Sequence, residues 1–320
     1  MGGLSRKISY INSLKNNNIN PIILDAGDAL FANTKYSLLS LPGAKYQAQA
    51  FLDGYEKIGC DALNIGEYDL AAGYDFLKSL EQNSTIPFIS ANLKNKETGE
   101  LAFEPYVIIN RDMLKIGIIG VTDNLQKEIS ELFKEDYLSA GQKLINKLRG
   151  EVDIIVMLVN SSVHQKDMIM ESFKDADYIY LSRTVSNTRI TTPQKDGYPI
   201  FYTIGLNGKY LLEVNTIIKN DSTPIVDISS FETKLTGISR QLIRLKKTER
   251  NQTIEEKYAD RPQAIAQIKH LEKQAIELED KKENVINISK IKMVALPKNA
   301  EFDADMQSFV DNALKVAKNQ

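Results

Sequence analysis

The stretch Ile22-Ile23-Leu24-Asp25-Ala26-Gly27-Asp28 decides the predicted fold, because an apolar run typical of a strand ends there in a turn. Outward from it, up to about residue 231, short β-branched runs alternate with segments of helical spacing. This alternation favours an α/β domain with helices packed on the sheet faces. The expected strands are 21–24, 62–65, 87–90, 107–110, 115–121, 153–159 and 178–181, and the expected helices are 4–14, 46–58, 74–80, 125–133, 139–148 and 163–173.

Helical spacing vanishes between Pro199 and Ile228. The segments 200–204, 210–218 and 224–228 are predicted as consecutive antiparallel strands, with turns at 206–208 and 220–221. A sheet that begins parallel and ends as a meander indicates two stacked sheets rather than one doubly wound sheet.

The composition changes at about residue 232, where Lys, Arg, Glu and Gln become dominant and glycine disappears after Gly237. Apolar residues recur there every three or four positions, interrupted at Asp260-Arg261-Pro262. We expect an antiparallel helical hairpin over 233–258 and 262–284 with a coiled-coil seam. The expected domains are a sandwich at 1–231, the hairpin at 232–284, and at 285–320 a strand and a C-terminal helix that pack back on the sandwich.

The composition narrows the function classes. The chain has 320 residues and a net charge of −2, so it has no field that would attract nucleic acid. The longest apolar run, 154–159, is too short for a transmembrane segment, and the first residues, MGGLSRK, do not form a signal peptide. Cys60 has no second cysteine to pair with and is expected to be a small buried residue.

Several segments together resemble the calcineurin-like metallophosphoesterase domain of the 5′-nucleotidase family. In order, they are Gly2-Gly3-Leu4-Ser5-Arg6, the strand and turn 22–31, Asp61-Ala62-Leu63-Asn64-Ile65-Gly66-Glu67-Tyr68-Asp69-Leu70, Pro87-Phe88-Ile89-Ser90-Ala91-Asn92-Leu93 and Leu114-Lys115-Ile116-Gly117-Ile118-Ile119-Gly120-Val121-Thr122. The resemblance covers about residues 2–231, with a shorter piece at 285–318. It implies a four-layer α/β/β/α sandwich, into which the helical hairpin is inserted.

The resemblance also implies a site with two metal ions held by His, Asp and Asn, which polarise a phosphoryl group and activate water. The family's first ligand block, Asp-X-His, would precede Gly2-Gly3. The Gly-Asp block, whose aspartate bridges both metals, is present as Gly27-Asp28. Asp28 is therefore the one ligand position that matches the family.

The other blocks depart from the family. Glu67 stands where the family has the asparagine ligand, and Tyr68 where it has a histidine. Asn160 follows the apolar run that should end in histidine. Arg183 and Val185 occupy the two histidine positions of the last block. Neither of the histidines in the chain, His164 and His270, replaces these ligands.

The substitutions predict a pseudoenzyme with no catalytic residue, no expected metal and no expected cofactor. Arg183 would place a guanidinium where a metal should lie, and could neutralise Asp28 or Glu67 in its stead. The simpler interpretation of Asp28 is a turn aspartate that bonds its own backbone. The expected role is binding or scaffolding, with a protein partner or self-association through the hairpin 233–284. By resemblance we expect a bacterial protein of the periplasm or cell surface.

Three alternatives stay open at this stage. An active phosphoester hydrolase could use Mn, Zn or Mg, with Asp28, Glu67 and Asn160 in a mononuclear site completed by residues before Gly2. An oxygen-only Mg²⁺ or Ca²⁺ site could combine Asp28, Glu67 and Asp69. Finally, a small-molecule module could use the vestigial cleft, with Arg183 holding a phosphate or carboxylate.

Overall fold

The computed structural model describes residues 3–206, 208–220, 222–248 and 252–320. Its contacts divide the chain into two compact units, the first made of Met1–Asn187, Lys195–Leu212 and Met293–Gln320, and the second of Thr188–Gln194 and Glu213–Lys292. We expected a boundary at 231/232, whereas the division falls between Leu212 and Glu213. The reason is that strands before the helical segment share a sheet with the strand after it.

The first unit contains two main sheets. One has the order β1-β2-β3 and is parallel; its strands are Leu24–Asp25, Ala62–Asn64 and Phe88–Ile89. The other has the order β10-β9-β8-β6-β5; its strands are Ile200–Thr203, Tyr178–Ser182, Ile154–Asn160, Leu114–Thr122 and Tyr106–Arg111. Only the edge strand β5 of this sheet is antiparallel to its neighbour. A small ribbon pairs β4 (Leu93–Asn95) with β7 (Leu132–Lys134).

The two main sheets lie against each other, and Gly120 on β6 lies in the contact between them. A Cβ atom on Gly120 would lie 2.5 Å from Asn64 Oδ1 and 2.7 Å from Ile89 Cγ1, atoms of the opposite sheet. Asn64 Nδ2 donates to the carbonyl oxygen of Val121 at 3.1 Å, and so links the sheets through a buried hydrogen bond. A glycine on β6 therefore sets the spacing between the layers.

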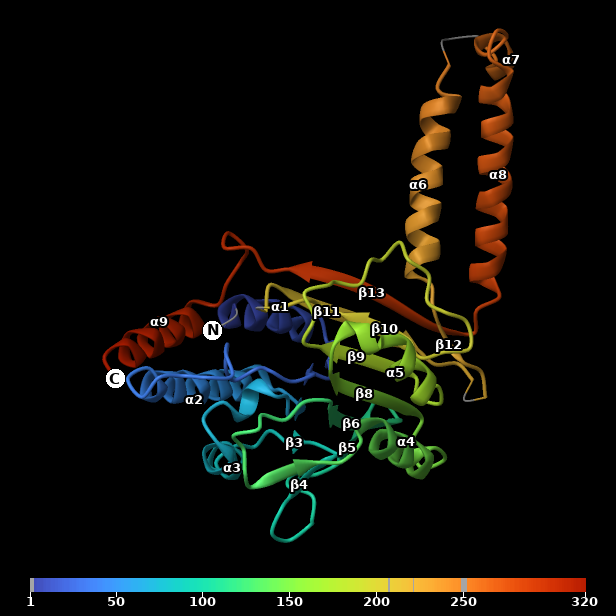
Figure 1. Ribbon diagram of the computed structural model, residues 1–320. Coiled ribbons are helices and arrows are strands. Elements are labelled where there is room, and N and C mark those ends of the chain that lie inside the picture. Colours follow the sequence, from blue (N-terminus) through green and yellow to red (C-terminus); the bar gives the residue numbers. More distant parts are fainter. Residues whose placement is uncertain (1–2, 207, 221, 249–251) are drawn as a thin grey trace. The chain divides into compact units, whose positions relative to one another are not determined.

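Helices cover the outer faces of both sheets (Figure 1). On the side of β1-β2-β3 lie α1 (Leu4–Asn16), α2 (Leu41–Ile58), α3 (Tyr74–Gln82) and α9 (Ala304–Lys318), and on the other side lie α4 (Tyr137–Leu148) and α5 (Lys166–Ser172). The core of the first side includes Leu52 and Phe88, and the core of the second includes Ile145 and Met157. The predicted four-layer α/β/β/α sandwich is thereby confirmed.

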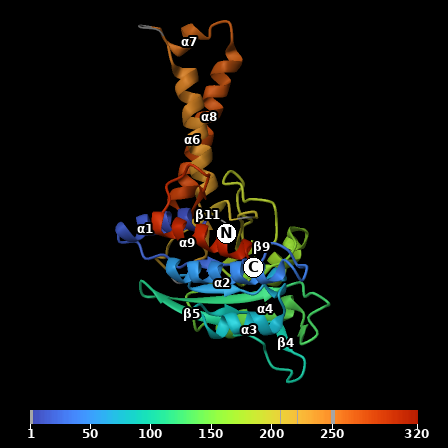
Figure 2. The same ribbon diagram turned by 90° about the vertical axis from the view of Figure 1, so that its left-hand side faces the viewer.

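The C-terminal helix α9 packs beside α1 and α2 in the first unit (Figure 2). The Asp303 side chain caps its first turn by accepting from the Met306 amide at 2.8 Å. Met306 and Val310 bury its apolar face. The amide of Asp303 also donates to the Ser5 carbonyl oxygen, which ties the end of the chain to its beginning.

The strands after residue 199 do not form the predicted meander. β10 joins the large sheet parallel to β9 instead of pairing with β11. β11 (Tyr210–Ile217) and β12 (Ile225–Asp227) do not pair with each other, because β13 (Asn287–Ala295) lies between them and runs parallel to β12. The expected turns at 206–208 and 220–221 each include a residue outside the described part. The segment 125–133, expected to be helical, is a loop that leads into β7.

A helical pair follows β12. α6 (Ser229–Lys246) packs along α8 (Pro262–Glu283), and the short α7 (Ile254–Lys257) precedes α8 (Figure 1). The helix α6 ends at Lys246, whereas the first helix of the hairpin was expected to extend to residue 258. A capping box at Thr253 starts the separate helix α7 within the remaining segment. Within the described ranges, no helix is both long and apolar enough to cross a membrane.

Candidate functional site

The site residues predicted from the sequence follow the carboxyl ends of parallel strands. Asp28 lies after β1 and Glu67 after β2, while Asn160 ends β8 and Arg183 directly follows β9. The first two belong to one sheet and the last two to the other, and the carboxyl ends of both sheets meet at the same edge. This edge is where α/β proteins usually hold their ligands.

Asp28 is fixed in a left-handed turn with φ 62°. Its Oδ1 accepts from the Tyr68 amide at 2.7 Å, and its side chain also bonds to Asn160. The chain passes very close at Gly66, where an added Cβ would lie 2.4 Å from Asp28 Oδ1 and 2.7 Å from Asn160 Nδ2. Gly66 is thus required for the approach of these two loops.

The Arg183 guanidinium forms an ion pair with Glu67. Both side chains are shielded, with exposed fractions of 29% and 16%. The guanidinium carbon lies 5.9 Å from the centre of the Tyr68 ring, within range of a cation–π contact. Burial raises the pKa of Asp28, while Asn160, the Tyr68 amide and the Arg183 charge pull it down. The positive charge of Arg183 thus favours the ionised form of Asp28 and pairs with the Glu67 carboxylate.

Asn160 links the two sheets below this ion pair. Its Nδ2 donates to Ser182 Oγ at 2.8 Å, and its Oδ1 accepts from Thr122 Oγ1 at 3.2 Å and from the Glu67 amide at 3.4 Å. Ser182 Oγ in turn donates to the Ala26 carbonyl oxygen at 2.7 Å, beside the Asp28 turn. Asn160 therefore uses both ends of its amide to hold neighbouring loops.

Asp69 is a fully buried carboxylate beneath the turn. It accepts four backbone N–H groups, from Asp28 and Gly66 at its Oδ2 and from Ala29 and Leu30 at its Oδ1, at 2.8–2.9 Å. Burial and the neighbouring Asp28 charge raise the pKa of Asp69 to about 7, and the N–H donors oppose that rise. Asp69 is a structural acceptor whose oxygens both face backbone.

The donors at this edge do not fit the two metal ions that the fold family implies. Within the described ranges, no group of three or more His, Cys, Asp or Glu side chains could hold a metal ion. The oxygens of Asp69 face backbone amides, and Glu67 faces Arg183. The oxygen-only site considered from the sequence would need those same atoms.

The structure leaves the remaining candidates outside this cluster. Val185, at a histidine position of the family, is 82% exposed. His164 is exposed on η2 (Val163–Gln165), and His270 is exposed on α8. Cys60 is buried, and burial raises the pKa of its thiol, so it is not poised as a nucleophile.

The sequence analysis missed the polar residues that connect the loops. Asn64, Thr122 and Ser182 are the last residues of β2, β6 and β9, and each bonds across to another strand or loop. Gln126 donates to the Glu67 carbonyl oxygen at 2.7 Å from the loop after β6. A polar residue at the end of an apolar strand was the available signal, and it recurs at all three strand ends.

Two kinds of comparison bear on this arrangement. No protein-family model matches the chain. Among solved structures, a 5′-nucleotidase precursor from Thermus thermophilus aligns over 99% of this chain and 54% of its own, with a TM-score of 0.65 and 13% identity. The calcineurin-like phosphoesterase YfkN from Bacillus subtilis aligns over 99% of this chain and 90% of its own, with a TM-score of 0.62 and 15% identity. The fold is thus that of the calcineurin-like phosphoesterases.

Comparison with curated proteins adds sequence relatives. A 5′-nucleotidase of Vibrio parahaemolyticus is 35% identical over 75 residues, which are 23% of this chain and 13% of that protein. A snake venom 5′-nucleotidase of Gloydius brevicauda is 27% identical over 190 residues, which are 56% of this chain and 31% of that protein. In sequence the chain is thus similar to parts of 5′-nucleotidases, and its matches span a third or less of these two relatives.

Proposed function

We propose that this protein is a catalytically inactive member of the 5′-nucleotidase family that works as a binding or scaffolding module. The observation that carries the proposal is the ion pair between Arg183 and Glu67. By resemblance, both positions belong to ligand blocks of the family. The guanidinium already lies against the carboxylate as a partner of opposite charge, and it repels a metal cation from the same place.

The rest of the edge supports the same proposal. In active enzymes of this kind, metal ions would polarise the phosphoryl group and activate a water molecule. Here the Asp28 side chain is hydrogen-bonded to Tyr68 and Asn160. The side-chain amide of Asn160 is hydrogen-bonded to Ser182, Thr122 and Glu67. These bonds give the residues a structural use, in which they lock the loops of two sheets together.

The binding role is assigned to the helical pair of α6 and α8. Its charged, amphipathic helices are unlike the alternating strands and helices of the sandwich. A location outside the cytoplasm, in the periplasm or at the cell surface of a bacterium, is part of this proposal. Its support is the kinship with a venom protein and with Vibrio 5′-nucleotidases, and fractionation of cells that express the natural gene tests it.

The test of inactivity is metal-dependent hydrolysis. Purified protein is assayed on a nucleoside monophosphate and on an aryl phosphodiester, with Mn²⁺, Zn²⁺, Mg²⁺ or a chelator. The matched control is Asp28→Ala, which removes the one ligand position that matches the family. We expect equal, background rates for the two proteins. Metal-stimulated turnover that is lost in Asp28→Ala would overturn the proposal and establish an active phosphoesterase.

A further inference from the structure

The helices α6 and α8 leave their shared apolar seam partly open. Ile238, Ile268 and Leu271 are buried, but the other large seam residues remain half-buried, namely Leu235, Leu242, Leu245, Ile265 and Leu278. Two helices alone cannot enclose a seam, because each leaves a flank of every seam residue toward solvent. Further helices would complete the burial, as in a four-helix bundle.

One side of the pair carries a second apolar stripe. Ile243 on α6 is 68% exposed and Ile276 on α8 is 59% exposed. A groove on that side is lined by α6 residues together with two from α8, namely Leu235, Thr236, Ile238, Ser239, Arg240, Leu242, Ile243, Lys246, Ala275 and Glu279. Ile276 follows Ala275 and lies about one helical turn from Glu279, so it borders this groove. We call this surface, together with Ile276, the Ile243 face.

The charges on the Ile243 face are divided between its helices. Arg240 and Lys246 lie on α6, whereas Glu279 lies on α8 beside Glu272, which pairs with Lys246. In the described part of the chain, no ion pair is found for Arg240 or Glu279. The face is therefore basic along one edge and acidic along the other.

The Lys246–Glu272 ion pair fixes which residues stand at the same height on the two antiparallel helices. One turn from that pair, Ile243 is level with Ile276. One further turn brings Arg240 level with Glu279, because each turn of either helix rises equally. The apolar pair Ile243 and Ile276 thus lies one turn from a charged pair on either side along the helices.

We propose that the Ile243 face binds the same face of a second copy of this chain, forming a four-helix bundle. A two-fold axis parallel to the helices places α6 of one copy over α8 of the other. Ile243 then packs on Ile276 of the second copy, and Arg240 meets Glu279 of the second copy, each contact occurring twice. This inference names the partner of the binding role proposed above and in that sense rests on it.

Charge decides between the possible two-fold axes. An axis across the helices at the height of Ile243 would place α6 over α6, with Arg240 facing Lys246 of the second copy. Like charges placed face to face disfavour that arrangement, whereas the axis along the helices brings Arg240 to Glu279 and Lys246 to Glu272 of the second copy. The arrangement with α6 over α8 is the self-complementary one.

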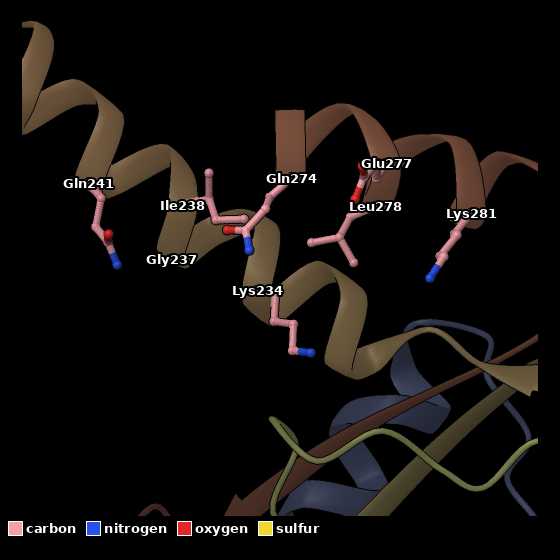
Figure 3. Close-up of a pocket in the computed structure, with 8 residues that line it drawn as sticks. All are labelled: Lys234, Gly237, Ile238, Gln241, Gln274, Glu277, Leu278 and Lys281. Atoms are coloured by element: carbon pink, nitrogen blue, oxygen red, sulfur yellow. The ribbon is translucent and has the colours of Figure 1, made fainter. Parts of the chain in front are cut away.

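The opposite side of the pair offers less to a partner. Its groove is lined by Lys234, Gly237, Ile238, Gln241, Gln274, Glu277, Leu278 and Lys281 (Figure 3). The apolar part consists only of the flanks of the seam residues Ile238 and Leu278. Lysine and glutamine side chains surround it, so it lacks an exposed apolar pair like that of Ile243 and Ile276.

The first test measures the mass of the full-length protein by light scattering across a dilution series. We expect twice the 36.0 kDa of the chain at high concentration. Arg240→Glu should weaken the association by about tenfold or more, and the added change Glu279→Arg should restore it by swapping the charges. The matched control is Gln274→Glu on the opposite side, which should leave the mass unchanged, and circular dichroism checks that every variant keeps its helices.

The second test fixes the arrangement by oxidative cross-linking. Ile243→Cys and Ile276→Cys are prepared as separate proteins and then mixed. The mixture should form a disulfide between chains faster than either variant alone. Faster cross-linking of Ile243→Cys alone would overturn the α6-over-α8 arrangement.

The outcomes separate this inference from the proposed inactivity. A monomer at all concentrations, or a dimer that Gln274→Glu weakens and Arg240→Glu does not, would overturn the inference. Neither result touches the hydrolysis assay. Hydrolytic turnover, conversely, would leave the mass measurements unchanged.

Discussion

Arg183 is the residue whose charge holds the polar cluster at the carboxyl ends of the strands. Arg183→Ala would leave Glu67 shielded without its cation, next to the Asp28 carboxylate. Because the pair is partly shielded, we expect a loss of about 1–3 kcal/mol in the free energy of unfolding. Urea denaturation monitored by circular dichroism measures it.

The control for that change is an ion pair at the surface. Lys35 and Glu128 pair with exposed fractions of 75% and 59%. Lys35→Ala should therefore leave the free energy of unfolding nearly unchanged, because water screens an exposed ion pair. Equal effects of Lys35→Ala and Arg183→Ala would mean that Arg183 has no special part in holding the edge.

Asp69 gives the protein a defined pH dependence. Its pKa is raised to about 7 in the folded state, against about 3.9 in an unfolded chain. Between these values the folded state binds more protons, so the free energy of unfolding should fall as pH rises from about 4 to about 7. Burial raises the pKa values of Asp28 and Asp177 too, which adds in the same direction.

Denaturation at a series of pH values tests this dependence. Position 69 cannot titrate in Asp69→Asn, so the free energy of unfolding should fall less steeply with pH than in the natural protein. The variant should also be less stable at every pH, because the asparagine side chain cannot accept all four N–H groups. An unchanged slope in Asp69→Asn would assign the dependence to other groups.

The sequence predicted only in part which residues come together at the site. The positions of Asp28, Glu67 and Arg183 at strand ends, and the pairing of Arg183 with a carboxylate, followed from the sequence and the resemblance. The roles of Asn64 and Ser182 did not, because their partners lie in other strands and loops. Val185 could not be placed either, because its orientation depends on the loop after β9.

Within single helices and strands, replacing glycine by alanine should have opposite effects on stability at Gly237 and Gly120. Gly237 lies inside α6, and a Cβ there would meet nothing within 4 Å. Gly237→Ala should therefore raise the stability of the helical pair by about 0.5–1 kcal/mol, since alanine loses less backbone entropy in a helix. Thermal unfolding of the full chain measures the change.

Gly120→Ala is the counterpart in the sandwich. A Cβ on β6 would press on Asn64 and Ile89 of the facing sheet, including the Ile89 backbone at 2.9 Å. We expect a loss of about 1–3 kcal/mol from this overpacking, measured by the same thermal unfolding. A neutral Gly120→Ala would mean that the two sheets are spaced more loosely than the structure shows.

Elements with strong periodicity were predicted well, and sheet order was not. The helices α1 and α4 and the strands β6 and β8 lie close to their expected bounds. The meander failed because β13, which follows the helical pair by sequence, inserts between β11 and β12. Local patterns carry no information on such a long-range partner.

At the scale of the whole molecule, the proposed loss of the metal site predicts how stability responds to metal. A metal that binds only the folded state stabilises that state. The gain in the free energy of unfolding grows with the logarithm of the ratio of the metal concentration to the dissociation constant. A working site saturated a thousandfold would add about 4 kcal/mol. We expect millimolar Mn²⁺ and a chelator to give the same unfolding temperature.

Arg183→Ala makes this whole-molecule test more informative. Removing the guanidinium takes away the cation that now faces Glu67 and leaves Asp28 without its positive neighbour. If Arg183 stands in for a metal, Mn²⁺ should raise the unfolding temperature of Arg183→Ala while leaving the natural protein unchanged, because the freed carboxylates then attract the ion. A metal-dependent rise in the natural protein would instead show that Arg183 and a metal occupy the edge together, and the proposed inactivity would lose its physical basis.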